Sequence, residues 1–329
     1  TLYSQIFQLQ SGECIIWNKK EKKTVFHRYF LYKQSTKYLT SKKSLLYQLG
    51  NIVDSIIDKI ILDSADSPVW VPLSGGLDSR LIICKLKEKG CKNLFSFSYG
   101  PPGNYEAKAA KTLAKKLEVP WQFVNISVSE AKKMFESDLR KQYWEFADQL
   151  CGAPVMEEFI AISILKENGH LTSDSIIING QSGDFITGDH IPEKILIGTC
   201  SGKKLFNAII SKHYSIWTYF STDKNRETIF KSLQKTLHIN ENDEMDVQTM
   251  ADLYEEWEYH ERQCKMVVNG QRIYDFHGLK WYLPLWDLEF VNFWSKIPFN
   301  LKLNRILFRD YLNEYNYMNV FKGYNSETR

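Results

Sequence analysis

Residues 70–80, which read Trp-Val-Pro-Leu-Ser-Gly-Gly-Leu-Asp-Ser-Arg, constrain the fold of this chain more than any other stretch. They predict a buried strand over 68–73, a tight polar turn, and a helix over 78–89. In such a unit the turn N–H groups point into one concavity, and the helix N-terminus adds partial positive charge. Gly75 and Gly76 let the backbone approach a bound anion with no Cβ in the way. The stretch therefore predicts an anion site at the end of a strand.

Three polar side chains of this turn suit a nucleotide phosphate. Ser74 and Ser79 can donate hydroxyl hydrogen bonds, and Asp78 can hold a divalent metal against the same phosphates. The turn is not a Walker phosphate loop, because no Gly-Lys-Ser/Thr follows its glycines. An ordinary β–α turn with a serine cap is the alternative interpretation of these residues.

Strands buried on both faces alternate with helices along residues 68–180, which predicts a parallel sheet with right-handed crossovers. The expected fold class is therefore α/β, with a doubly wound parallel sheet. The expected strands are 68–73, 94–98, 121–126 and 175–179, and the expected helices are 78–89, 104–117, 128–149 and 154–168.

The segments on either side of this unit have different patterns. Apolar residues at helical spacing predict a helix over 41–63 that packs on the sheet, with Ser41 as its N-cap. Residues 1–33 alternate in short β-like runs around a Lys-rich turn, which indicates a β-hairpin. Residues 193–300 are expected to be mainly helical.

In parallel sheets of this kind, ligands bind beyond the carboxyl ends of the strands. The loops after Leu73, Ser98 and Asn179 are expected at that edge. Their convergence indicates a nucleotide site more strongly than any one of the loops does alone.

The string Ser-Gly-Gly-x-Asp-Ser resembles the pyrophosphate-binding loop of the N-type ATP pyrophosphatases, the PP-loop superfamily. Other stretches narrow this to the synthetase domain of the glutamine-hydrolysing asparagine synthetases and their relatives. The stretches that carry the likeness are 94–100, 180–185, 271–287 and 305–309. The likeness extends over roughly residues 1–322 and is strongest in the loops.

The resemblance implies an ATP-dependent reaction that forms an amide. A carboxylate attacks the α-phosphorus of ATP to give an acyl-adenylate and pyrophosphate, and an amine then displaces AMP. Asp78 and Asp184 fall on the aspartates associated with Mg²⁺, although Asp184 also fits an Asx-type turn. The residues that fall on the ATP contacts are Leu73, Ser74, Gly75, Gly76, Asp78, Ser79, Tyr99, Asn179 and Gly180.

Two further residues match the family pattern, and each has an alternative explanation. Lys322 falls near the late lysine that neutralises the α-phosphate, and a surface lysine explains it equally well. Glu106 falls where the family has an acidic residue, and a favourable charge at a helix N-terminus is the alternative.

The acceptor side departs from the asparagine synthetase pattern. Gln181 stands where those enzymes have a catalytic glutamate beside the incoming ammonia, and Phe185 replaces a second acidic residue. A neutral amide cannot accept a proton or pair with ammonium. We therefore expect the carboxylate or the amine to differ from that of plain asparagine synthesis, with a sugar uronate or another small carboxylic acid as the acceptor. Asparagine formation is the competing interpretation.

The resemblance also implies a domain organisation. Residues 1–38 resemble the last strands of a glutaminase domain and its linker, and residues 39–329 resemble the ligase domain. The nucleophilic cysteine that opens a glutaminase domain is not in this sequence. Ammonia is therefore expected from a domain outside it, or the incoming amine is another molecule.

Composition narrows the possible binding partners and the cellular compartment. A net charge of +3 is too small to indicate a nucleic-acid or membrane partner, and no run approaches the ~20 apolar residues of a membrane span. The six cysteines show no metal-site spacing, which predicts reduced thiols in the cytoplasm. A nucleotide-binding module that has lost catalysis and serves a partner is the alternative to an enzyme.

Overall fold

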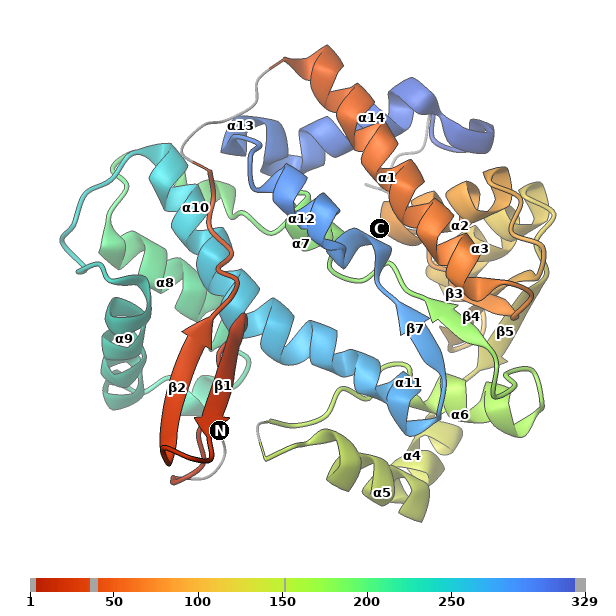
Figure 1. The fold of residues 1–329 in the computed structure, drawn as a ribbon, viewed down its shortest axis with the longest axis horizontal. Helices are drawn as coiled ribbons and strands as arrows, with labels where there is room; N and C mark the ends of the chain where they lie inside the picture. The colour runs from red at the N-terminus through yellow and green to blue at the C-terminus, as the bar shows by residue number, and fades with distance from the viewer. Residues whose placement is uncertain (1–3, 36–40, 151, 323–329) are drawn as a thin grey trace.

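The computed structural model describes residues 4–35, 41–150 and 152–322 of the 329-residue chain. Its centre is a five-stranded sheet with the order β5–β4–β3–β6–β7, in which every pairing is parallel (Figure 1). The strands are β3 (Val69–Pro72), β4 (Leu94–Gly100), β5 (Trp121–Asn125), β6 (Ile176–Ile178) and β7 (Lys280–Tyr282).

Side chains alternate along β3 and divide between two cores. Val69 and Val71 pack on one face of the sheet, whereas Trp70 packs on the other. Helices on the Val71 face are α1 (Lys42–Ser64), α2 (Leu77–Glu88), α3 (Tyr105–Lys116), α12 (Leu288–Trp294) and α14 (Ile306–Tyr315). Helices on the Trp70 face are α5 (Asp138–Ala147), α6 (Phe159–Glu167) and α11 (Arg272–Phe276). The doubly wound α/β fold is therefore confirmed.

A third core belongs to the helical part of the chain. It joins α8 (Gly202–His213), α9 (Asp223–Leu237) and α10 (Val247–Glu258). Beyond α10 the chain continues as a wider π-helical stretch over Tyr259–Val268, which leads back toward the sheet through α11. The short helix α13 (Phe299–Lys302) lies between α12 and α14. The expected helical C-terminal part is confirmed.

Three expected elements differ from the structure. The predicted helix 128–149 is two helices, α4 (Val128–Glu136) and α5, because Ser137 is extended and its hydroxyl accepts a hydrogen bond from the Arg140 N–H at 3.1 Å. The helix predicted over 154–168 begins only at Phe159. Strand β7, in a segment expected to be mainly helical, is an edge strand held by β6.

The predicted N-terminal hairpin consists of β1 (Glu13–Asn18) and β2 (Lys23–Arg28), which pair antiparallel. Ser11, just before this hairpin, forms a hydrogen bond with His260 in the π-helical stretch, and Figure 1 shows the hairpin on this side of the molecule. Ser41 occupies the N-cap of α1 but its side chain caps no N–H. The predicted domain boundary between residues 38 and 39 lies outside the described residues.

Two general expectations concern cysteines and membranes. The cysteines in the described part of the chain are free thiols. Across residues 4–35, 41–150 and 152–322, no helix is both long enough and apolar enough to cross a membrane.

Candidate functional site

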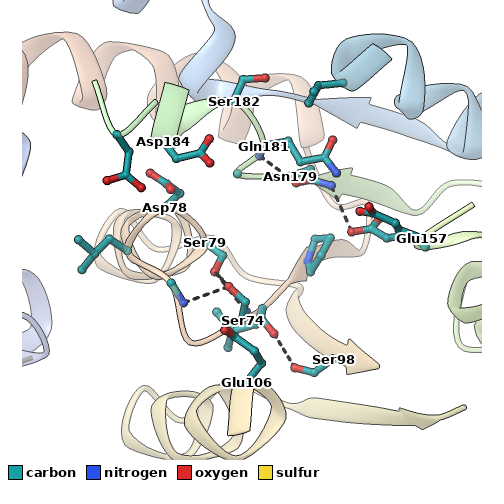
Figure 2. A pocket seen from close by; sticks show the side chains of 18 of the residues that line it. Ser74, Asp78, Ser79, Ser98, Glu106, Glu157, Asn179, Gln181, Ser182 and Asp184 are labelled. Atoms are coloured by element: carbon teal, nitrogen blue, oxygen red, sulfur yellow. Dashed lines mark hydrogen bonds between the residues drawn. The ribbon is translucent and has the colours of Figure 1, made fainter. Parts of the chain in front are cut away.

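The strand order reverses at β3, and this reversal places the site. The chain leaves β3 toward β4 on one side, whereas β6 pairs with β3 on the other side. The loops that follow β3 and β6 therefore diverge and leave a crevice at the carboxyl edge of the sheet. A cavity of about 870 Å³ lies there, lined by the loops after β3, β4 and β6 (Figure 2).

The loop over residues 74–79 is organised by its own side chains. The Ser74 N–H donates to Ser79 Oγ at 3.2 Å, and the Gly76 N–H donates to Ser74 Oγ at 3.1 Å. The Gly75 N–H donates to a carboxylate oxygen of Glu106, in the first turn of α3, at 2.5 Å. A carboxylate therefore already binds a donor of the predicted anion site, so Glu106 does more than favour the start of a helix.

Asp78, at the start of α2, forms a bidentate ion pair with Arg305, with one N–O distance of 3.0 Å. Burial raises the pKa of the Asp78 carboxyl, and the Arg305 guanidinium opposes this rise. The backbone brings Arg305 to the cavity through two successive left-handed residues, Asn304 (φ 54°) and Arg305 (φ 61°). Non-glycine residues seldom adopt this conformation, and such positions concentrate at functional sites.

Asp184 lies in the short helix α7 (Gly183–Ile186) after β6 and pairs with His190, whose Nε2 is 3.0 Å from the carboxylate. The other ring nitrogen, Nδ1, bonds Glu258 at the end of α10. Burial opposes the charged imidazole, but the two carboxylates outweigh burial and raise the pKa of His190 to about 9. The same cluster, acting against burial, lowers the pKa of Asp184 and lowers that of Glu258 to about 2.

The two aspartates face the same end of the cavity (Figure 2). A Cβ on Gly183 would lie 2.6 Å from Asp78 Oδ1, so the loop that carries Asp184 packs directly on Asp78. Mg²⁺ is usually held by one or two carboxylates together with phosphate oxygens and waters. Within the described ranges no three or more His, Cys, Asp or Glu side chains are grouped so that they could hold a metal ion by themselves. The residues therefore fit a magnesium ion shared with phosphates, and the metal role of Asp78 and Asp184 stays a prediction.

Across the cavity from the loop lies a set of uncharged groups, together with one buried carboxyl, that we call the amide wall. Figure 2 shows Asn179, Gln181 and Ser182 on the side away from Ser74. The Gln181 N–H donates to Asn179 Oδ1 at 3.0 Å, and its side-chain oxygen accepts from the amide of Gln271. The residues of the amide wall are Glu158, Asn179, Gln181, Ser182 and Gln263.

Glu158 is a member of this wall to which the sequence analysis gave no role, as are Ser182 and Gln263. Its side chain lines the cavity at the start of α6 and is only 6 % exposed. The Tyr274 hydroxyl donates to its carboxylate, and Asn179 Nδ2 lies 3.5 Å away. Burial raises the pKa of Glu158 to about 7. Two adjacent glutamates directly before the apolar run of α6 were the sequence signal.

The remaining predicted residues are divided between the cavity and the surface. Leu73, Tyr99 and Gly180 line the cavity, whereas Gly75 is not among the lining residues. The Leu73 carbonyl accepts from Ser98 Oγ at 2.6 Å. Lys322 is exposed and is not among the lining residues, although its backbone N–H bonds Asn316. Its proposed contact with the α-phosphate stays a prediction. Sequence analysis gave no site role to Arg305 and His190, which also line the cavity.

Comparisons with known proteins agree with the resemblance found in the loops. The asparagine synthase family matches residues 61–316, which is well over half of the chain. No curated protein matches the chain. One similar solved structure is an NH3-dependent NAD synthetase from Campylobacter jejuni subsp. jejuni NCTC 11168, in complex with the nitrate ion. It is 18 % identical, its TM-score is 0.30, and the match covers 60 % of this chain and 85 % of that chain. The match over residues 61–316 shows that the chain belongs to the asparagine synthase family of ATP-dependent amide ligases.

Proposed function

We propose that this protein activates a small carboxylic acid with ATP, forming an acyl-adenylate and pyrophosphate, and then transfers ammonia or another amine to it. The observation that carries the proposal is the shared cavity. The phosphate-loop hydroxyls, both aspartates and the predicted adenosine contacts all line it, at the switch point of the sheet.

In the first half-reaction the protein has to bind three phosphates and stabilise pyrophosphate as it leaves. Ser74 and Ser79 supply hydroxyl donors, and the N-terminus of α2 supplies partial positive charge. Arg305 and Arg309 also line this part of the cavity and add full positive charges. Asp78 and Asp184 would hold magnesium, which neutralises phosphate charge when bound.

The adenosine is proposed to lie against Leu73, Tyr99, Asn179 and Gly180, at the ends of β3, β4 and β6. Gly180 is needed because the chain approaches α2 closely. A Cβ there would be 3.0 Å from the Ser79 nitrogen and 3.2 Å from the Asp78 carbonyl carbon. The two loops therefore form one continuous surface for a nucleotide.

The acceptor carboxylate is proposed to lie along the amide wall. Amide and hydroxyl groups there, from Gln181, Ser182 and Gln263, can donate to and accept from hydroxyl groups of a ligand. Asparagine formation would use an acidic side chain beside the incoming ammonia, which an amide at position 181 does not provide. A sugar uronate or another hydroxylated carboxylic acid therefore fits better, with ammonia from a glutaminase domain that lies outside this sequence.

The direct test is carboxylate-dependent exchange of labelled pyrophosphate into ATP. We expect exchange with one or more uronic acids such as glucuronate or galacturonate, and no exchange with Asp78→Ala. If aspartate alone supports exchange, the proposed acceptor is wrong. If no carboxylic acid supports exchange, the ligase activity itself is wrong.

A second function is favoured by one observation: the charged side chains of the site already bind other groups of the protein. Asp78 binds Arg305, Asp184 binds His190, and Glu106 binds the Gly75 N–H. A nucleotide-binding module that has lost catalysis and serves a partner would tolerate such contacts. It predicts ATP binding, measured by calorimetry, without pyrophosphate release for any acid.

A further inference from the structure

Glu158 differs from the other carboxylates discussed at the cavity in the partners that it binds. Asp78 and Asp184 bind cationic side chains, and Glu106 binds a loop N–H. Glu158 instead bonds two uncharged groups, the Tyr274 hydroxyl and the Asn179 amide. Because neither partner neutralises its charge, this carboxylate is free to take up a proton.

We propose that Glu158 is the base that accepts the proton of the attacking amine. This inference rests on the ligase function proposed above and assigns a residue to its second half-reaction. The amine nitrogen forms a bond to the acyl carbon, and the carbon–oxygen bond to AMP breaks, so AMP leaves with the electron pair. The proton released from the nitrogen goes to the Glu158 carboxylate and from there to solvent.

The hydrogen bonds along the amide wall are directional and lead to Glu158. Asn179 Oδ1 accepts from the Gln181 N–H at 3.0 Å, which turns Asn179 Nδ2 toward Tyr274. The Tyr274 oxygen accepts from Nδ2 at 2.8 Å, so its single proton is directed at Glu158. This arrangement favours the ionised carboxylate, which is the form a base needs.

The proton affinity of Glu158 suits a base that accepts a proton from an amine. Burial and the neighbouring Glu157 raise its pKa, while the Tyr274 and Asn179 hydrogen bonds lower it, with a net value of about 7. Tyr99, on β4, also faces it, and burial raises the pKa of that phenol. A base is most effective when its pKa is near the operating pH. Gln181 cannot serve, because an amide does not take up a proton at neutral pH.

The first test separates the two half-reactions in Glu158→Gln. Labelled pyrophosphate exchange reports the adenylation step, and amide formation with ammonium chloride reports the amine step. We expect exchange within about 2-fold of wild type and amide formation reduced by about 100-fold or more, the usual loss of a general base. Glu167→Gln, at the exposed end of the same helix, is the matched control and should change neither rate.

The second test uses pH, because a merely structural residue would not move a pH profile. The wild-type amide-forming rate should fall below about pH 7, where Glu158 becomes protonated. The rate of Glu158→Gln should not show this fall at low pH. Tyr274→Phe removes a hydrogen bond that stabilises the ionised Glu158 carboxylate. The fall in rate of this variant should therefore begin at a higher pH than in wild type. Thermal melting of each variant identifies loss of folding.

The outcomes distinguish this inference from the proposed function. If wild type exchanges pyrophosphate and Glu158→Gln still forms the amide within 5-fold of wild type, the base assignment is wrong and the ligase stands. If Glu158→Gln loses exchange as severely as amide formation, Glu158 acts in nucleotide binding and the assignment is again wrong. If wild type shows no exchange with any carboxylic acid, the ligase proposal fails and this inference fails with it.

Discussion

The two sides of the cavity are built in different ways. The phosphate side is mostly one local stretch, residues 74–79, whose serines and backbone N–H groups bond to one another. The amide wall takes Glu158 from α6, Asn179 and Gln181 from the loop after β6, and Gln263 from the π-helical stretch. The functional groups of a local turn can be recognised in the sequence, whereas those of a wall assembled from distant helices cannot.

The two sides of the cavity also differ in the charge of their side chains. The phosphate side holds ion pairs, Asp78 with Arg305 and Asp184 with His190. The amide wall consists mainly of neutral hydrogen-bonding groups. We infer that the phosphate side carries the activation chemistry that the family shares, and that the amide wall carries the choice of acceptor.

The largest expected effect is that of Asp78→Asn, on the phosphate side. The change removes a proposed metal ligand and leaves the buried Arg305 without its carboxylate. We expect pyrophosphate exchange to fall by about 100- to 1000-fold, and the free energy of unfolding in urea to fall by about 3 kcal/mol.

The control for this substitution is Asp138→Asn. Asp138 carries the same side chain, but its carboxylate is 84 % exposed and pairs with Lys141 on the surface. Exchange and stability should both match wild type. Exchange in Asp78→Asn within 5-fold of wild type would contradict the assignment of this side to the phosphates.

Gly183→Ala tests how tightly the two loops meet. A Cβ at this position would lie 2.4 Å from Leu285 Cδ1 and 2.6 Å from Asp78 Oδ1. We expect overpacking to lower the free energy of unfolding by about 1–3 kcal/mol, measured in urea. Gly152→Ala, with nothing within 4 Å of the new Cβ, is the control and should stay within about 0.5 kcal/mol of wild type. Equal stability of both variants would show that the packing at Gly183 is loose.

The His190 cluster predicts a dependence of stability on pH. Its folded pKa of about 9 is above the unfolded value of about 6.5. The stabilisation is therefore fully present below pH 6.5 and is lost as pH rises through about 9. We expect wild type to lose about 2 kcal/mol relative to His190→Gln between these limits, by urea unfolding. The exposed His27→Gln should follow the wild-type curve, and a similar slope in His190→Gln would contradict the prediction.

Gln181→Glu should have the smallest effect and addresses the amide wall. The Gln271 amide can still donate to the new carboxylate, so the wall keeps its shape. We expect exchange to shift toward acids that carry an ammonium group by about 3- to 5-fold, the value of a partly exposed charge pair. Gln234→Glu, on α9 and outside the cavity lining, should leave the preference unchanged. An unchanged preference in Gln181→Glu would show that residue 181 does not set the acceptor.

Some site residues were predictable because their signal is local. The glycines and serines of residues 74–79 are consecutive, and the strand before them and the helix after them have clear periodicities. His190 carries no comparable signal, since a single histidine has many possible environments, and the stretch 305–309 that resembles the family does not show what Arg305 binds. Their partners, Asp184 and Asp78, lie on other elements, and only the packed chain brings them within bonding distance.

Errors in the fold have equally specific causes. The helix expected over 128–149 breaks at Ser137 because a single hydroxyl caps α5 there, and the periodicity on either side does not show the break. Strand β7 is three residues long and exists through its pairing with β6, so its own sequence contains too few alternations to indicate a strand.

The sequence alone determined the parallel α/β fold and the position of the phosphate loop. These depend on periodicity and turn chemistry within short windows of the chain, where neighbouring residues are necessarily close in space. Only the tertiary structure placed Glu158 with Asn179 and Tyr274 and set Arg305 against Asp78. Such contacts join residues far apart in the chain, and burial rather than residue type gives the Glu158 carboxyl its raised pKa.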